Sequence, residues 1–324
     1  MKHLRGVAAL YTLVVASPAL AFVQSVAQDT SKPLAWKSSR VAYSVNPAHF
    51  KSTPGCASAA VAAALAKASF PAWTNATHPG QSQPCTSFQF VDGGDTASKA
   101  LGYDQTAGAN NENLVVFRSG VCTALAASDP ICGAVDLSAC VTRYNCWEHD
   151  STSGPGGTIA LTTVTYVPST GEILDADMEL HDWNGSISSP DGMYFTCAPP
   201  EAGTCSDPGY SQSGCVYWDV GNTVTHEAGH MLGLDHCAVG GAGATACPNS
   251  GTALNPEYPV MAPTATFGDT DKRTLKPDDI DGVCTIYPVK DSGGGCGCGT
   301  ASASGLALLG LFLAALRPRR RSAQ

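Results

Sequence analysis

Residues 226–236 read HEAGHMLGLDH and contain three histidines within eleven positions. On a helix, positions four apart share a face, so His226 and His230 can offer two imidazole nitrogens to one ion. Gly233 can adopt the left-handed conformation that ends a helix, and the turn lets His236 return as a third ligand. Three neutral imidazoles leave the fourth position of a tetrahedral zinc ion open to water, which is typical of a catalytic site.

Glu227 directly follows the first histidine and can reach a metal-bound water without being a ligand itself. Zinc lowers the pKa of bound water from about 15.7 to about 7 and polarises a carbonyl oxygen. A carboxylate beside that water can take its proton and pass it to a leaving amine. The pattern therefore predicts hydrolysis of an amide bond with one zinc ion. Its five fixed positions would arise by chance in a chain of this length on the order of once in ten thousand sequences.

The pattern HExxHxxGxxH resembles that of the metzincin zinc peptidases, and two further stretches resemble the matrixin branch of that family. YPVMAP at 258–263 is similar to the Met-turn beneath the zinc, with Met261 as its methionine, and LKPDDIDGV at 275–283 is similar to the start of the C-terminal helix. More weakly, GEILDADME at 171–179 is similar to the strand that edges the substrate cleft. The likeness covers about half of the chain between its two ends, from about residue 158 to 287.

This resemblance implies an α+β fold with a mixed, mostly parallel twisted sheet, an active-site helix and a C-terminal helix. It implies a zinc endopeptidase in which His226, His230 and His236 bind the metal and Glu227 is the general base. An extended polypeptide substrate would add itself to the strand near 173–180. Two alternatives stay open: a metzincin fold that only binds at a surface, and a zinc hydrolase of small amides or esters.

Three acidic residues alternate along a predicted strand, which puts Asp175, Asp177 and Glu179 on one face. Hard oxygen ligands in this arrangement could hold a structural calcium ion, and the alternative is an acidic edge exposed to solvent. Asp177 stands where family members with a structural zinc have a histidine. Because His149 and His181 are scattered single histidines, we expect no second zinc.

The chain of 324 residues is acidic, with 18 Lys plus Arg against 27 Asp plus Glu. No Lys or Arg occurs between Tyr144 and Asp271, so nucleic acid is a poor candidate partner. Fourteen cysteines indicate disulfides and an oxidising compartment. Matrixins usually have Ser or Thr after the third histidine, whereas this chain has Cys237, for which Cys247 is a nearby candidate disulfide partner.

The two ends of the chain are predicted to be targeting segments. Residues 1–21 combine basic residues, an apolar run at 6–15 and a small-residue cleavage pattern at 19–21, which indicates a signal peptide rather than a buried helix. Residues 291–299 form a Gly/Cys-rich hinge, and residues 300–324 form an apolar segment followed by arginines.

This C-terminal arrangement resembles the sorting tails of secreted myxobacterial proteins. The resemblance implies processing near Cys296 and Cys298, and the alternative is a transmembrane anchor that is never cleaved. We therefore expect a secreted or cell-surface protein that touches a membrane only through this tail.

Between these ends, residues 33–290 are expected to form one metalloprotease catalytic domain, active as a monomer. Alternating or β-branched runs predict strands at 40–45, 87–91, 114–118, 158–167 and 173–180. Helices are predicted at 57–70, where Pro71 ends the helix, at 223–232 with Asn222 or Thr223 as N-cap, and from Pro277 onward.

Overall fold

The computed structural model describes twelve stretches of the chain: 22–48, 56, 58–119, 121–122, 129–132, 137–149, 158–182, 193–197, 216–238, 246–247, 258–265 and 269–289. All of them belong to one structural unit, which ends at Val289. The predicted signal peptide, hinge and C-terminal tail lie outside the described residues, as do Cys205, Cys215, Cys296 and Cys298.

The central sheet contains five strands at positions where the sequence predicted them. These are β3 (Arg40–Asn46), β4 (Gln89–Asp95), β5 (Asn113–Ser119), β6 (Ala160–Val167) and β7 (Glu172–Asp182). With the short strand β2 (Ala35–Trp36), the order is β2-β7-β5-β3-β4, and β6 also pairs with β7. Only β6 runs antiparallel to its neighbour in this sheet, so the prediction of a mixed, mostly parallel sheet is confirmed.

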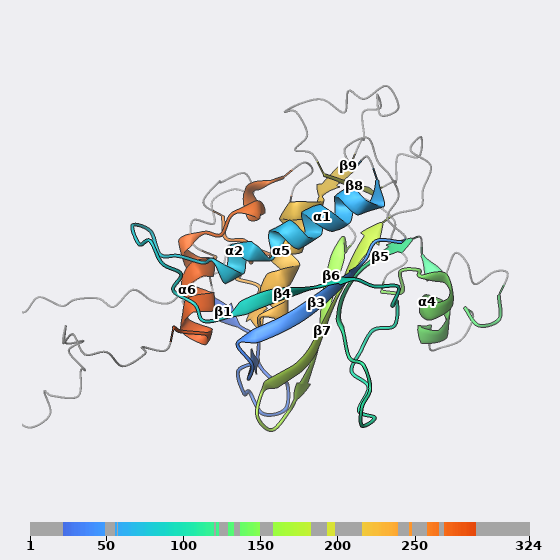
Figure 1. The fold of residues 1–324 in the computed structure, drawn as a ribbon, viewed down its shortest axis with the longest axis horizontal. Coiled ribbons are helices and arrows are strands. Elements are labelled where there is room, and N and C mark those ends of the chain that lie inside the picture. The colour runs from blue at the N-terminus through green and yellow to red at the C-terminus, as the bar shows by residue number, and fades with distance from the viewer. Residues whose placement is uncertain are drawn as a thin grey trace, which may run out of the picture. The chain divides into compact units, whose positions relative to one another are not determined.

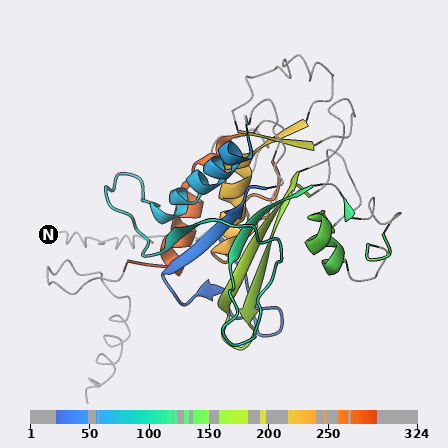
Figure 2. The same ribbon diagram turned by 45° about the vertical axis from the view of Figure 1, so that its right-hand side comes forward.

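The long helices lie on one face of this sheet, and a shorter helix lies on the other side, as Figures 1 and 2 show. The first group comprises α1 (Ala59–Ser69), α5 (Val220–Met231) and α6 (Pro277–Ile286), and the shorter helix is α4 (Ser138–Tyr144). Helix α6 begins at Pro277, as predicted. Pro71 does follow α1, but it also starts another short helix, α2 (Pro71–Thr74), because proline suits the first helical position.

Helix α5 begins three residues earlier than the sequence predicted. Asp219 is the N-cap, and its side chain accepts a hydrogen bond from the Asn222 amide at 2.7 Å. Aspartate is as good an N-cap residue as asparagine, so the helix begins directly after the first capping residue that the chain offers, which is Asp219. Helix α5 is buried along nearly its whole length, from Val220 to Gly229 and again at Met231.

Two small sheets complete the fold. Strand β1 (Val23–Gln24) pairs antiparallel with β10 (Leu234–Asp235), and β8 (Met193–Thr196) pairs parallel with β9 (Val216–Asp219). Strand β9 leads directly into α5, and β10 follows it closely. Both ends of the helix are thus attached to β-structure.

Disulfides link distant parts of the chain, as the cysteine content predicted. Among the described residues they are Cys56–Cys197, Cys85–Cys284, Cys122–Cys146, Cys132–Cys140 and Cys237–Cys247. The last pair is the one expected from the sequence. None of the helices formed by the described residues is long and apolar enough to cross a bilayer.

Candidate metal centre

The three histidines of the sequence pattern converge on one point. His226 and His230 lie one turn apart on α5, and His236 follows β10. The Nε2 atom of His236 lies 3.1 Å from Nε2 of His226 and 3.0 Å from Nε2 of His230. Zinc bound to nitrogen at about 2.0–2.1 Å in a tetrahedron places its ligand nitrogens about 3.3 Å apart. The spacing of the three nitrogens therefore fits a single zinc ion.

The second ring nitrogen of the two helical histidines determines their tautomer. His226 Nδ1 lies 2.5 Å from the Val260 carbonyl oxygen, and His230 Nδ1 lies 2.9 Å from that of Leu234. A carbonyl oxygen only accepts, so each Nδ1 carries the proton and each Nε2 presents a lone pair. Lone pairs that face one another at this distance repel unless a cation lies between them. The donor set thus fits a metal ion.

The surroundings keep these rings neutral. Burial lowers the pKa of His226 well below its usual range, and the nearby Lys272 ammonium lowers it further. Burial also lowers the pKa of His230, and it brings the pKa of His236 to about 4 with help from the charge of His230. A metal ligand must offer an unprotonated nitrogen, which all three rings do near neutral pH.

Gly233 ends α5 and lets the chain return. Its φ is +88°, which disfavours side chains, and an added Cβ would lie 2.4 Å from the Leu34 carbonyl oxygen. Its carbonyl also accepts a hydrogen bond from the Ser25 amide at 2.8 Å. The N-terminal segment that contains β1 therefore holds the turn that presents His236.

Met261 packs beneath the metal-binding turn of α5. A Cβ on Gly229 would lie 2.2 Å from the Met261 sulfur and 2.8 Å from Trp73 Cζ2, so glycine is what allows this approach. The Asp279 carboxylate on α6 accepts hydrogen bonds from the amides of Val260 at 2.9 Å and Met261 at 3.2 Å. The two stretches that resemble matrixins are therefore in direct contact.

Glu227 lies beside the histidines and is 5 % exposed. Its Oε2 accepts a hydrogen bond from the Thr162 hydroxyl of β6 at 2.8 Å. Burial raises its pKa to about 7, against the opposing effect of this hydrogen bond. A carboxylate with a pKa near the working pH can both accept and release a proton.

A cavity of about 680 Å³ lies in front of these groups. Its walls are β6 with the residues just before it, helix α5, and Pro263 to Ala265, and the three histidines, Glu227 and Lys272 also line it. The prediction that the strand near 173–180 edges the cleft is wrong. Strand β7 pairs with β5 on one side and β6 on the other, so β6, whose only partner among the described strands is β7, forms that edge.

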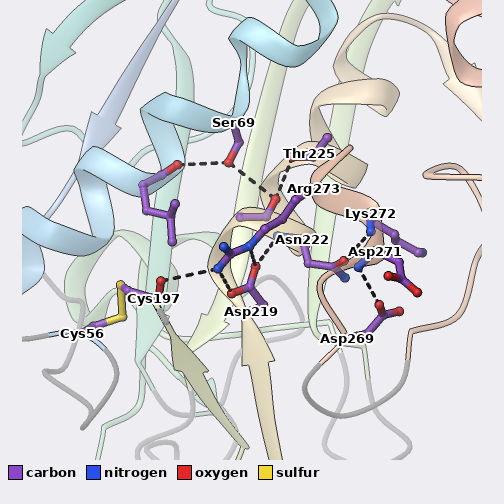
Figure 3. Close-up of polar contacts among 12 residues, drawn as sticks. Cys56, Ser69, Cys197, Asp219, Asn222, Thr225, Asp269, Asp271, Lys272 and Arg273 are labelled. Atoms are coloured by element: carbon purple, nitrogen blue, oxygen red, sulfur yellow. Dashed lines mark hydrogen bonds and ion pairs between the residues drawn. A yellow bond between two sulfur atoms is a disulfide. The ribbon is translucent and has the colours of Figure 1, made fainter. Parts of the chain in front are cut away.

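The first turn of α5 is attached to the short 3-10 helix η1 (Asp271–Arg273), as Figure 3 shows. Arg273 Nε donates to Asp219 Oδ1 at 2.7 Å, and the same oxygen accepts the Asn222 amide. The Asn222 side-chain oxygen in turn accepts the Lys272 amide at 2.8 Å. These bonds hold the segment that follows Met261 against helix α5.

The three acidic residues of β7 are buried rather than exposed to solvent, so the alternative of a solvated acidic edge is wrong. Asp175, Asp177 and Glu179 are 2 %, 1 % and 0 % exposed. Glu179 accepts from Arg118 Nε at 2.6 Å, and its other oxygen lies 2.6 Å from His149 Nε2. Glu179 therefore already has cationic partners from the protein. We call Arg118, Glu179 and His149 the back-face network, because it faces away from α5.

The remaining two carboxylates lie next to each other. Asp177 accepts hydrogen bonds from the amides of Gly102 at 2.6 Å and Leu114 at 2.9 Å. Asp175 Oδ2 is buried and has no hydrogen-bond partner among the described residues. Burial raises the pKa of Asp175 to about 8, and the charge of Asp177 adds to the shift. The calcium site stays a prediction, since a bound proton would also neutralise Asp175.

The single histidines are engaged elsewhere: His149 bonds Glu179, and His181 stacks on the Trp147 ring at 4.6 Å. Two further groups of potential ligands occur among the described residues, His78 with Cys85 and Cys284, and Cys122 with Cys140 and Cys146. Their cysteines are all in disulfides.

Sequence reasoning missed the residues that support this centre: Thr162, Asp219, Lys272, Arg273 and Asp279. Asp219 had a local signal, because it is a capping residue directly before the helix. Lys272 is notable in the sequence as the first basic residue after the long stretch without Lys or Arg. No protein-family model matches this chain, and no curated protein matches its sequence at a significant level.

Proposed function

We propose that the protein is an exported, zinc-dependent endopeptidase with a matrixin-like metzincin fold. The observation that carries this proposal is the convergence of three neutral imidazole nitrogens beside a buried glutamate on the wall of an open cavity. The mostly parallel sheet and the Gly229–Met261 packing are consistent with it.

Each residue of the site has its own role in the proposed reaction. His226, His230 and His236 would hold zinc, which supplies an activated water and polarises the scissile carbonyl. Glu227 would act as the general base, accepting a proton from the attacking water and passing it to the nitrogen of the leaving amine. Thr162 holds the Glu227 carboxylate by a hydrogen bond and so fixes its direction toward the cavity.

The substrate we propose is an extended polypeptide. Strand β6 has one pairing partner among the described strands, and residues of this strand line the cavity. Its other edge offers backbone donors and acceptors with which a peptide can pair as an added strand. Peptide addition would place a backbone amide in front of Glu227, which the β6 residue Thr162 already contacts.

Export is part of the proposal. The disulfides among the described residues require an oxidising compartment, which fits the signal peptide expected at 1–21. We propose a secreted or cell-surface location, with the segment 300–324 as a sorting tail. The mass of the mature protein tests this, because a chain that retains residues beyond Cys298 has not been cleaved at the tail.

Glu227→Ala tests the enzymatic proposal. The variant should bind zinc as the wild type does, yet digest casein on the order of 10²–10⁴-fold more slowly, because the general base is missing. Glu172→Ala, a half-buried glutamate at the start of β7, is the matched control and should keep full activity. A zinc chelator should abolish digestion by the wild type.

The possible results separate the alternatives. Casein digestion at the wild-type rate by Glu227→Ala would contradict the assignment of the base. Cleavage of small esters without digestion of casein would indicate a small-molecule hydrolase. Zinc-loaded wild type that cleaves neither substrate would indicate a binding module that uses the same fold.

A further inference from the structure

Lys272 is a buried cation in the wall of the catalytic cavity. It is 4 % exposed, and it lines the same cavity as Glu227 and the three histidines. Among the described residues no ion pair joins its ammonium group to a carboxylate, although the charges of Asp269, Glu227 and Asp279 act on it. Burial of a charge is costly unless a partner compensates for it.

The described residues accept hydrogen bonds from only part of the N–H donors of the Lys272 ammonium group. Lys272 Nζ donates to the carbonyl oxygen of Ala262. It also lies 3.4 Å from His226 Nδ1, but that nitrogen already donates its own proton to Val260 and offers no lone pair. An ammonium group has three donors, so two of them have no acceptor in the described protein.

The neighbouring residue, Arg273, is a cation with a purely structural role, and its surroundings differ from those of Lys272. Arg273 follows Lys272 in η1 and forms an ion pair with Asp219, whereas the Lys272 side chain leads away from this pair (Figure 3). The backbone amide of Lys272 is meanwhile bonded to Asn222 on α5. Lys272 is thus held in place by its main chain while its charge lacks a carboxylate.

We propose that Lys272 forms a subsite in the cavity that binds a substrate carboxylate next to the scissile bond. The inference rests on the proposed peptidase function and names the substrate class: peptides with Asp or Glu, or with a free C-terminal carboxylate, at one of the two residues that flank the cleaved bond. We place the carboxylate there because Lys272 lines the same cavity as Glu227 and lies 3.4 Å from Nδ1 of His226, the ring nitrogen on the side away from the metal position. A carboxylate would accept the two remaining ammonium hydrogens.

The overall charge of the protein narrows the preferred substrate further. The formal net charge of −9 repels acidic chains over long distances, whereas the Lys272 contact acts only inside the cavity. We therefore expect one carboxylate at the subsite within an otherwise neutral or basic segment. A polyacidic peptide should be a poor substrate at low salt and a better one as salt screens the repulsion.

Matched peptides test the inference on the wild-type enzyme alone. Peptides that differ only by Glu or Gln are compared at each residue that flanks the scissile bond and at a residue four positions away. At one flanking residue we expect kcat/KM to be about 10- to 100-fold higher for Glu, and at the distant residue no preference. Peptides that end at the flanking residue, as free acid or amide, show whether a terminal carboxylate can serve.

Lys272→Met removes the ammonium group and keeps an unbranched apolar side chain that is one atom shorter. In this variant the Glu and Gln peptides should be cleaved at similar rates, and the zinc content should stay at the wild-type level. Lys37→Met, at an exposed lysine, should leave the preference intact. Binding gives a readout apart from turnover: in a Glu227→Gln background, the Glu peptide should bind more tightly than the Gln peptide, and Lys272→Met should remove the difference.

The outcomes distinguish the inference from the proposed function. If no peptide is cleaved by the zinc-loaded protein, the peptidase proposal fails. If peptides are cleaved but Glu and Gln are equivalent at both flanking residues, the peptidase stands and the carboxylate subsite is wrong. A Glu preference that persists in Lys272→Met would also overturn the assignment of Lys272.

Discussion

Two buried polar regions lie on opposite sides of the central sheet and are built on opposite principles. On the back face, Arg118 donates to Glu179, which also bonds His149, so each charge has an opposite partner within the protein. Neighbouring Asp177 likewise accepts two backbone amides. The charges of these groups compensate one another, although Arg118 Nη2 and Asp175 Oδ2 have no hydrogen-bond partner among the described residues.

At the metal centre, by contrast, groups of the same kind face one another. The Nε2 atoms of His226, His230 and His236 converge, and carbonyl oxygens of Val260 and Leu234 fix the tautomers of the first two rings so that their lone pairs point inward. Polar groups are buried in both regions, so burial does not distinguish one region from the other. The difference is that opposite charges meet in the back-face network, whereas three acceptor nitrogens meet at the candidate metal centre, an arrangement that fits a cation.

The largest effect should come from removing a partner inside the back-face network. Arg118→Met leaves the Glu179 charge buried at 0 % exposure with only His149 beside it. We expect a loss of about 3–5 kcal/mol in the free energy of unfolding, measured with a chemical denaturant. Arg143→Met, whose side chain is 57 % exposed in its pair with Asp129, is the control and should change stability by less than about 0.5 kcal/mol.

Zinc binding by the folded fraction of Arg118→Met should be unchanged, because the network faces away from the metal centre. If Arg118→Met were as stable as the wild type, the contrast between the paired charges of the back-face network and the converging acceptor nitrogens of the candidate metal centre would be lost.

The second effect concerns Asp175, the one back-face carboxylate without a complete set of partners. Its pKa is about 8 in the folded protein against an ordinary value of 3.8, so between these values the folded state holds a proton that the unfolded chain has released. Stability should therefore fall as pH rises through neutrality, by roughly 1.4 kcal/mol per pH unit from this group. Asp175→Asn should flatten the dependence, and Asp29→Asn, an exposed control, should not.

Bound calcium is the alternative to a bound proton at Asp175. If calcium occupies the site, added calcium should stabilise the wild type most at high pH, where Asp175 is ionised, and should have little effect on Asp175→Asn. Absence of any calcium effect at pH 8 would contradict the calcium prediction and leave the bound proton as the explanation.

The convergence of the three histidines could be predicted from the sequence because its geometry is local. The spacing of His226 and His230 alone places them on one helix face, and Gly233 alone predicts the turn that returns His236. The alternation of acidic residues on β7 likewise predicted a shared face. The alternation could not predict that these side chains are buried. The residue that neutralises Glu179 is Arg118, which comes from another strand, 61 positions away.

Strand pairing and distant side chains account for the remaining differences. Alternating apolar residues identify both β6 and β7 as strands, but they do not say which is paired on both sides. Lys272 reaches the first histidine across 46 positions, and only the folded chain brings the two together. Such long-range contacts depend on the path of the chain between them, for which the sequence carries no local signal.

A third prediction tests how closely the metal centre is packed. Alanine normally stabilises a helix relative to glycine by about 1 kcal/mol, but at Gly229 its methyl group would collide with Met261 and Trp73. We expect Gly229→Ala to lower the free energy of unfolding by about 1–3 kcal/mol and to weaken zinc binding. A Cβ on Gly221 in the same helix would lie 3.1 Å from Arg273 Nε and 3.3 Å from Asp219 Oδ1, which are milder conflicts, so Gly221→Ala should cost less stability than Gly229→Ala.

Truncation of the methionine provides the check. The double variant Gly229→Ala with Met261→Ala should be more stable than the sum of the two single changes predicts, because the smaller side chain relieves the collision. Strict additivity would show that the two residues are not in contact and that the turn at Met261 does not support the helix.

The smallest effect should come from Thr162, whose hydroxyl joins β6 to Glu227: it lies 2.8 Å from the carboxylate Oε2 and 3.2 Å from the backbone carbonyl oxygen. Thr162→Val keeps the shape of the side chain and removes the hydroxyl, which should lower kcat/KM about 2- to 10-fold, the value of one hydrogen bond. Thr162→Ser should restore the rate, and Thr163→Val, whose side chain is exposed on the other face of β6, should not change it. Because the partner of Thr162 is the proposed general base, the loss should appear in turnover and not in stability. A variant with normal turnover but reduced stability would place Thr162 with the structural groups of the back face and would remove it from the catalytic centre.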